Sequence, residues 1–341
     1  MADDERERAA QATMDGEMRL LDPEARASPD RVLQLLDPEF SEIAASATVA
    51  AAAGCEGEVT GSGSLQSYIE RLPAPALSAL VQTVWVHHTG GVPYVQRRLP
   101  AGGVELHWPL GGEPRLVGPL TGPLLEVIPA HTTIVGIRFR PGSNPLIPVA
   151  LSELLDQAVG LRELGHRWVE QLGEAMVNAA TPEAALSLLQ AQLLHEVRAA
   201  IRPDPLVDEA ARLLMPWQQA EVGVLAAHLG LSASQLRRRC LHVVGVSPKV
   251  LQRILRFQGF LALAQATTAP LGQRGLDGMA GLASDVGYAD QSHLSRECLR
   301  LAGVTPSALF GGEVDRCLRE HDHAASYRSF LASRRGPSAR R

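Results

Sequence analysis

The sequence predicts an α+β fold in which a small N-terminal β-rich domain is followed by helices and then by an all-helical C-terminal domain. Residues 67–140 hold short, β-branched or alternating runs separated by Gly and Pro. From residue 145 onward, apolar residues recur three and four positions apart, which is the period of an amphipathic helix. One segment also occurs twice: LRRRCLHVVGVSP begins at Leu236, and LSRECLRLAGVTP begins 58 positions later at Leu294. Such a repeat indicates one small unit used twice.

Bulk composition supports folded domains. A chain of 341 residues fits two or three domains, and 45% hydrophobic residues can form cores, built mainly from Leu, Val and Ala because aromatic residues are scarce. The four cysteines are too widely spaced to indicate a zinc site or a disulfide framework. The start of the chain lacks the features of a signal peptide, and no apolar run is long enough to span a bilayer. We therefore expect a cytoplasmic protein with no membrane contact.

Charge is distributed unevenly along the chain. The net charge is −5, yet residues 1–60 alone carry 14 acidic and 5 basic residues, while residues 205–310 and 311–341 each have a net charge of +3. We predict that residues 1–66 form an acidic, poorly ordered arm and that residues 313–341 form a basic tail. A basic C-terminal part is compatible with a nucleic-acid partner.

The β-rich domain is predicted to cover residues 67–160 as a small antiparallel sheet or barrel. Its expected strands lie at 80–88, 94–99, 104–110, 124–128 and 133–140. Helices are expected at 146–161, 167–179 and 182–201, the last with Thr181 as N-cap and Pro182 in the first turn. Residues 161–204 would serve as a helical linker or dimerisation segment. The Pro-rich stretch 202–206 marks the start of the last domain, 205–312.

Each copy of the repeat is predicted to form a helix, a tight turn and a second helix. Gly230 and Gly287 suit the left-handed conformation that ends a helix. Ser232 and Asp290 suit the N-cap of the helix that follows. This order of elements is the helix-turn-helix layout.

The two copies are joined by a predicted helix over residues 248–266, about 27 Å long at 1.5 Å per residue. Gly245 and Gly303 would end the second helix of each copy, with Ser247 or Thr305 capping the next helix. The joining helix is close to the length of one duplex turn, about 34 Å.

The second helix of each copy has an apolar stripe and a polar face. Apolar spacing predicts that Leu236, Cys240 and Leu241 are buried in the first copy, and Leu294, Cys298 and Leu299 in the second, so both thiols would be core residues. The polar faces are rich in side chains that suit base edges and phosphates. An ordinary solvated face is the alternative, but the match of Arg238 with Arg296 favours DNA contact. The predicted DNA-binding residues are Ser234, Gln235, Arg237, Arg238, Arg239, Gln291, Ser292, His293, Ser295 and Arg296.

Residues 281–310, GLASDVGYADQSHLSRECLRLAGVTPSALF, resemble the signature of the AraC/XylS family of bacterial transcription regulators. The resemblance implies a sequence-specific regulator whose two recognition helices enter successive major-groove segments of double-stranded promoter DNA. Two departures concern the core rather than the polar faces. The family usually has Phe where Cys240, Leu294 and Cys298 stand, and the segment 267–278 is longer and richer in Gly.

Residues 94–112 and 136–145 resemble an uncharacterised, cupin-like β-rich domain that is often fused ahead of AraC-type domains. By this resemblance the N-terminal half would be a regulatory module. The partners that it leaves open are a small-molecule effector, a contact with RNA polymerase and a second copy in a homodimer.

Other chemistry is weakly supported. Metal could be held by residues on or near the predicted strands, namely His87, His88, Glu105, His107 and His131, but no H-x-H motif with a matching Glu supports them. An anion pocket could be lined by Arg97, Arg98, Arg138 and Arg140. We predict no metal, no cofactor, no catalytic residue and no enzyme. The alternatives are a metal- or ligand-binding enzyme or sensor carrying a passenger DNA-binding domain, and a module that binds a protein such as RNA polymerase.

Overall fold

A computed structural model describes residues 66–143, 150–165, 168–199, 204–218, 220–266, 281–311 and 321–334. All of them belong to one compact unit, Ser64–Arg341. The predicted arm up to residue 65, the segment 267–278, Cys55 and Cys317 lie outside the described residues. None of the helices in the described part has the length and apolarity needed to cross a membrane.

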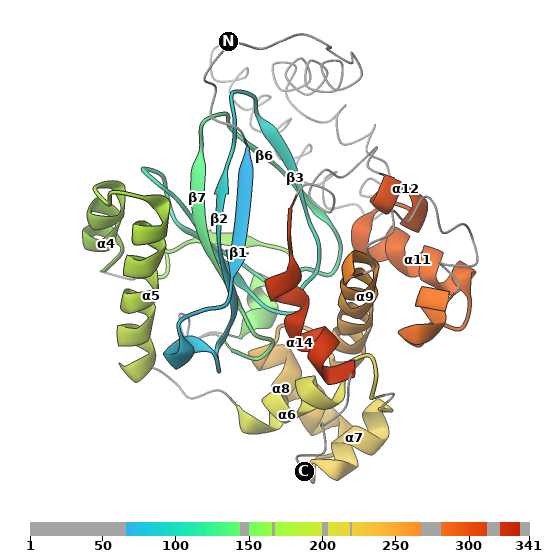
Figure 1. The fold of residues 1–341 in the computed structure, drawn as a ribbon. Helices are drawn as coiled ribbons and strands as arrows, with labels where there is room; N and C mark the ends of the chain where they lie inside the picture. Colours follow the sequence, from blue (N-terminus) through green and yellow to red (C-terminus); the bar gives the residue numbers. More distant parts are fainter. Residues whose placement is uncertain are drawn as a thin grey trace, which may run out of the picture. The chain divides into compact units, whose positions relative to one another are not determined.

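The β-rich domain contains a six-stranded antiparallel sheet (Figure 1). In spatial order its strands are β1 (Ser67–Arg71), β2 (Val81–His88), β7 (Thr133–Phe139), β4 (Glu105–Pro109), β5 (Arg115–Val117) and β8 (Ala158–Gly160). In the β2–β7 pair, Trp85 lies opposite Gly136. A Cβ atom at Gly136 would lie 2.1 Å from the indole ring, so glycine is required for this close approach.

A second sheet pairs β3 (Tyr94–Arg98) with β6 (Leu124–Ile128). A small apolar cluster of Trp85, Tyr94, Ile128 and Ile134 joins it to the larger sheet. The five strands predicted from the sequence therefore correspond to β2, β3, β4, β6 and β7. The short strands β1, β5 and β8 were not predicted.

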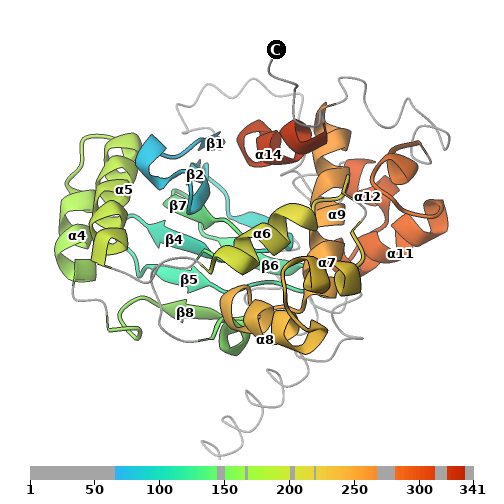
Figure 2. The ribbon, with the colours of Figure 1, turned by 90° about the horizontal axis from the view of Figure 1, so that it is seen from below.

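Helices α4 (Trp168–Val177) and α5 (Pro182–Ala199) cover one side of the larger sheet, as Figures 1 and 2 show. Their buried Met176 and Leu189 share a core with Leu106 and Ile137 of the sheet. Burial of side chains of this kind contributes about 1.5–3 kcal/mol each. The predicted N-cap of α5 is confirmed, because Thr181 Oγ1 accepts a hydrogen bond from the Ala184 amide at 3.1 Å.

The predicted helix over 146–161 is wrong in the part that is described, residues 150–161. A single 3-10 turn covers Leu151–Leu154 and the chain then enters β8. Asp156 has a left-handed φ of 57°, and its carboxylate accepts two hydrogen bonds from Thr121, both at 2.7 Å. These contacts hold the backbone in a turn. The apolar residues that suggested a helix, such as Leu151 and Leu154, are instead buried from a short turn and loop.

The C-terminal part is helical. Its elements are α6 (Pro205–Leu213), α7 (Val222–His228), α8 (Ala233–Val243), α9 (Pro248–Ala266), the helical residues 281–285, α11 (Gln291–Ala302), α12 (Pro306–Gly311) and α14 (Ala324–Arg334). Helix α9 has the bounds predicted for the joining helix, and nearly every residue from Ile254 to Ala264 is buried. A helix buried on all sides has neighbours on all sides, and here α6, α8, α11 and α14 contact it.

Helix α14 connects the two halves of the unit. Its Tyr327 and Phe330 are buried in the helical core, while Ser326 reaches β1 and donates a hydrogen bond to Glu70. Trp217 holds the end of the helix by donating from Nε1 to Phe330 O and Ser333 Oγ, both at 2.9 Å. Part of the segment predicted as a basic tail is therefore a packed helix. The α+β fold class is confirmed.

Candidate nucleic-acid interface

The first helix-turn-helix unit consists of α7, a tight turn and α8. Gly230 ends α7 with a φ of 67°, and the amide of Leu231 donates to Ala226 O at 2.9 Å. Ser232 Oγ accepts from the Gln235 amide at 3.2 Å, while Gln235 Oε1 accepts from the Ser232 amide at 2.8 Å. This reciprocal pair is a capping box. The side-chain oxygen of Gln235, a predicted DNA contact, is thus used by the cap.

The second unit repeats this geometry with residues 281–285 and α11. Gly287 has a φ of 82°, and the amide of Tyr288 donates to Ala283 O at 2.9 Å, as Leu231 does to Ala226. Asp290 caps α11 by accepting from the His293 amide at 2.6 Å. The predicted left-handed glycines and both predicted caps are confirmed. The two sequence copies therefore fold as two copies of one local structure.

The buried stripes are confirmed for four of six residues. Leu236, Cys240, Leu294 and Cys298 are fully buried. Burial raises the pKa of Cys240 to about 11 and that of Cys298 to about 12, so both thiols stay protonated in the core. Leu241 is half-buried, and the prediction for Leu299 is wrong because it is 49% exposed. On a helix, residue i+7 points in nearly the same direction as residue i, whereas residue i+5 points well away from it. The buried stripe that begins at Leu294 therefore continues at Leu301 and not at Leu299.

None of the ten predicted DNA-binding residues is buried. Gln291, His293 and Ser295 are half-buried, and the other seven, including Arg238 and Arg296, are exposed. Their contact with DNA stays a prediction. Figures 1 and 2 both draw α9 between α8 and α11, so the two polar faces belong to helices on different sides of the joining helix.

Several charged residues beside these faces were missed by sequence reasoning. Asp204 lies 2.6 Å from the Arg239 guanidinium. Glu297, on the inner side of α11, binds Arg253 of α9 at 3.0 Å and Arg300 at 3.1 Å. Glu297 therefore fixes α11 to α9 through a salt bridge, a role that no local pattern indicates.

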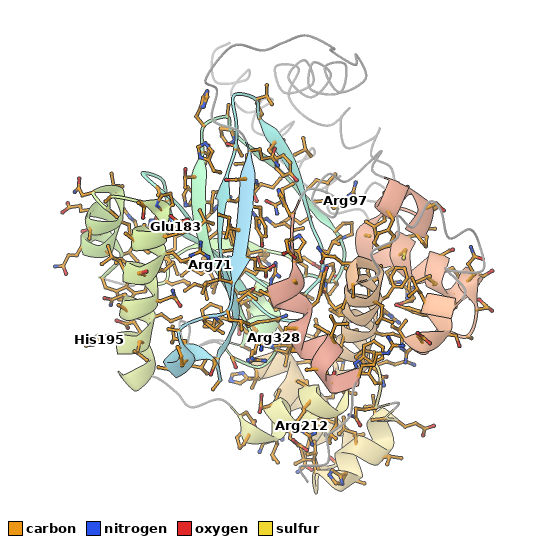
Figure 3. The ribbon with its side chains drawn as sticks, in the orientation of Figure 1. Arg71, Arg97, Glu183, His195, Arg212 and Arg328 are labelled. Atoms are coloured by element: carbon orange, nitrogen blue, oxygen red, sulfur yellow. The ribbon has the colours of Figure 1, made fainter. Side chains whose placement is uncertain are left out.

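Both second helices end against the β-rich domain. At Gly245, which follows α8, a Cβ atom would lie 2.6 Å from Pro119 and 2.9 Å from Leu151 O. At the end of α11, Arg97 Nη1 donates to Ala302 O at 2.8 Å. Figure 3 shows Arg97 between β3 and helices α11 and α12. The β-rich domain thus contacts both predicted reading helices at their C-terminal ends.

The arginines considered as an anion pocket lie mostly in an internal ion-pair network. Arg98 binds Glu126 at 2.5 Å and His107 at 2.8 Å, and Arg138 binds Glu105 at 2.7 Å. Arg140 lies apart and donates to Ser78 O at 2.8 Å. Arg97, Arg98 and Arg138 line one cavity, and Arg140 does not.

The network sets the charge states of its members. Burial raises the pKa of Glu105, but the nearby Arg138 and the hydrogen bond with His107 more than offset it, so the pKa lies well below its usual range. Burial, and then the charge of Arg98, lowers the pKa of His107 to about 4. The carboxylate is therefore ionised and the histidine neutral at physiological pH.

The histidines considered as metal ligands are dispersed. His107 lies 3.0 Å from Glu105, whereas His88 Nδ1 lies 2.9 Å from Thr133 Oγ1. His131 stands in a turn with a φ of 56°. In the described part of the chain, no group of three His, Cys, Asp or Glu residues has the geometry of a metal site.

Comparison with known protein families supports the assignment of the two repeated units as helix-turn-helix units. Residues 225–311 match the family model described as "Helix-turn-helix domain". The C-terminal domain is an AraC-type helix-turn-helix domain. This AraC-type domain makes the chain a DNA-binding transcription regulator. Residues 69–160 match a domain of unknown function, DUF6597.

No curated protein matches the chain. Among solved structures, ToxT from Vibrio cholerae (P21 form) is 13% identical with a TM-score of 0.38, covering 72% of this chain and 98% of its own. ToxT from Vibrio cholerae O395 is 12% identical with a TM-score of 0.39, covering 72% and 97%.

Proposed function

We propose that the protein is a sequence-specific transcription regulator that inserts α8 and α11 of its AraC-type domain into two successive major-groove segments of one operator. The observation that supports this most directly is the pair of equivalent units, each with a left-handed glycine, a capped second helix and an exposed arginine at the matching position, Arg238 or Arg296.

The proposed roles follow from side-chain chemistry. Arginines can bind phosphates or pair bidentately with guanine, and Gln291 can pair with adenine. Helix α9, about 27 Å long, sets a spacing between the units close to the turn of the duplex. Counterion release would make the affinity fall steeply with salt.

Control by the β-rich domain is the second part of the proposal. Its contacts at Gly245 and Ala302 support a direct influence on the position of α8 and α11. The protein would act in the cytoplasm and without enzymatic activity of its own. An effector, a contact with RNA polymerase and a homodimer stay predictions from the resemblance.

The test begins with selection of the preferred duplex from a random pool by the full-length protein. Arg296→Ala should then weaken binding to that duplex by about 1–3 kcal/mol and relax the preference at one base position. Arg238→Ala should do the same at a position about one duplex turn away.

Arg300→Ala is the matched control, since Arg300 is on the same helix but is bound to Glu297. An equal loss on every duplex would reduce Arg296 to a phosphate contact. A pool that yields no preferred sequence would refute the proposal.

A further inference from the structure

Helix α9 is buried along most of its length, but three polar side chains on it reach the two helix-turn-helix units. Gln252 donates a hydrogen bond at 2.6 Å to a backbone oxygen just before α7, in the first unit. Arg253 lies 3.0 Å from the Glu297 carboxylate of α11, and the guanidinium of Arg256 lies 5.8 Å from the centre of the Tyr288 ring. Polar contacts of one helix therefore bear on the positions of both units.

The contact at Glu297 involves a buried charge. The side chain of Glu297 is 9% exposed, and its partners are Arg253 on α9 and Arg300 on its own helix. Separating a buried charge from a partner is costly, because the charge has already lost its hydration. Arg300 moves with α11, whereas Arg253 does not. Rotation of α11 about its axis, or sliding of α11 along α9, would therefore break the Glu297–Arg253 pair and is opposed by it.

The apolar side of α11 gives less directional support. Leu294, Cys298 and Leu301 are buried in the same core as α9. The free energy of apolar burial depends on the area removed from water and hardly on direction. These three side chains therefore hold α11 against the core but tolerate small rotations. The ion pair supplies the directional restraint that apolar packing lacks.

The first unit carries the opposite charge at the equivalent position. Arg239 precedes Glu297 by 58 residues, which is the offset of the repeat. It binds Asp204 of α6 at 2.6 Å. An ion pair thus ties the second helix of the first unit to α6 and that of the second unit to α9. Because α9 joins the two units, the Glu297–Arg253 pair acts on the position of α11 relative to α8.

We propose that Glu297 and Arg253 are positioning residues that fix the distance and rotation between α8 and α11, and thereby determine which separation of two half-sites the regulator accepts. Neither residue needs to touch DNA for this role. The proposal rests on the proposed function. One added base pair moves a half-site by about 3.4 Å and turns it by about 35° around the duplex. A restraint on small rotations of α11 therefore discriminates between neighbouring separations.

The first experiment measures the distance between the units in the full-length protein, without DNA, by double electron–electron resonance. Spin labels are attached at Ser234→Cys and Ser292→Cys, which are equivalent, exposed positions on α8 and α11. Cys240 and Cys298 are buried, and the other two native cysteines are replaced by serine. One narrow distance distribution is expected, and Glu297→Gln should broaden or shift it. The same distribution with and without Glu297→Gln would overturn the positioning role.

The second experiment measures the affinity for the selected operator and for duplexes with one base pair inserted or removed between its half-sites. For the wild type, either change should weaken binding by about tenfold or more, the loss that a poorly placed base contact causes. In Glu297→Gln the loss should shrink to about threefold or less, because α11 can follow the shifted half-site. Ratios of affinities are compared, since Glu297→Gln also removes a negative charge near Arg300 and can strengthen binding to every duplex.

Arg253→Gln is the second variant. It removes the link to α9 and leaves Glu297 bound to Arg300, so it should relax the preference for one separation in the same way. Its result decides if Glu297→Gln does not fold. Arg253→Lys keeps the positive charge and should keep the preference. Glu183→Gln is the matched control, because Glu183 forms an exposed ion pair with Arg71 and lies on α5, away from α9 and α11 (Figure 3).

The two proposals fail in different ways. A merely structural role of the ion pair would weaken binding to all duplexes by the same factor and leave the preferred separation unchanged. That result, in both Glu297→Gln and Arg253→Gln, refutes the positioning role and leaves the proposed function standing. If no operator can be selected, the proposed function fails together with the claim about half-sites, and the distance measurement still decides whether the ion pair orients α11.

Discussion

One carboxylate oxygen of Asp204 accepts a hydrogen bond from the guanidinium of Arg239 on α8 at 2.6 Å. The other oxygen caps α6 by accepting a hydrogen bond from the Leu206 amide at 3.0 Å. One acidic residue therefore begins the helical domain and partly neutralises the predicted DNA-binding face. Because the pair is partly exposed, its contribution to stability is small. Its effect on DNA binding is expected to be larger.

Asp204→Asn should increase DNA affinity. Asn is as good an N-cap as Asp, so α6 keeps its start, while a negative charge beside Arg239 disappears. We expect a several-fold gain in affinity and a steeper salt dependence, by about one unit in the slope of log K against log salt. Fluorescence anisotropy at several salt concentrations measures both. Asp285→Asn, which removes a carboxylate paired with Arg334, is the charge-matched control. Weaker binding by Asp204→Asn would contradict this role.

The contact between α8 and the β-rich domain can be isolated with two glycines. Gly245 and Gly230 both have left-handed φ values, 85° and 67°, so alanine costs about 1 kcal/mol at either from backbone strain. Only at Gly245 would the new Cβ meet Pro119 and Leu151, at 2.6 and 2.9 Å. Urea unfolding should show Gly245→Ala to be less stable than Gly230→Ala by at least about 1 kcal/mol. Equal losses would mean that this contact is loose in solution.

Stability should fall as the pH drops from about 6.5 toward 4. Burial, and then Arg98, lowers the pKa of His87 to about 4, and burial lowers that of His321 to about 3. Unfolded histidines take up protons below about pH 6.5 whereas these folded ones do not, so protonation favours the unfolded chain. The full stability is present above pH 6.5. His87→Phe should reduce the slope by about 1 kcal/mol per pH unit, measured by urea unfolding at pH 7.5, 6 and 5.

A slope identical in His87→Phe and wild type would show that His87 is not a buried neutral group. At lower pH the carboxylates add a further loss. Burial raises the pKa of Glu126, but Arg98 and Arg115 more than offset it and bring it to about 2. Its stabilising contribution is therefore lost only as the pH falls from about 4.5 toward 2.

Helix α14 should be essential for stability. Phe330 is 3% exposed in the helical core, so Phe330→Ala is expected to cost about 3 kcal/mol. Arg328, two residues earlier on the same helix, is exposed (Figure 3), and Arg328→Ala should change stability by less than about 0.5 kcal/mol. Thermal unfolding of both variants tests this. A small loss for Phe330→Ala would indicate that α14 is not packed in solution.

Local geometry was predictable from the sequence where single residues determine it. Gly230 and Gly287 adopt the conformation that glycine tolerates best, and Ser232 and Asp290 cap helices with side-chain oxygens. Both rules act within a few residues and therefore appear as patterns. The full or partial exposure of the ten predicted DNA-binding residues follows from the helical period of the sequence.

Long-range partners were not predictable in this way. Glu70 on β1 is bound by His323 and Ser326, more than 250 residues later, and Arg97 binds Ala302 across 205 residues. No spacing rule encodes such pairs, because they depend on how whole elements pack. The same limit explains the error at residues 150–161, where contacts of Asp156 with Thr121 decide the backbone.

The pairing of β1 with α14 has a consequence for synthesis on the ribosome. Some of the hydrogen bonds to the buried Glu70 carboxylate come from His323 and Ser326, which are translated 253 and 256 residues after it. At about 5–20 residues per second, the nascent chain waits on the order of ten seconds or more for them. Until then the Glu70 carboxylate in the sheet lacks part of its hydrogen bonds. Chains that terminate before α14 should therefore fold poorly and be degraded more readily.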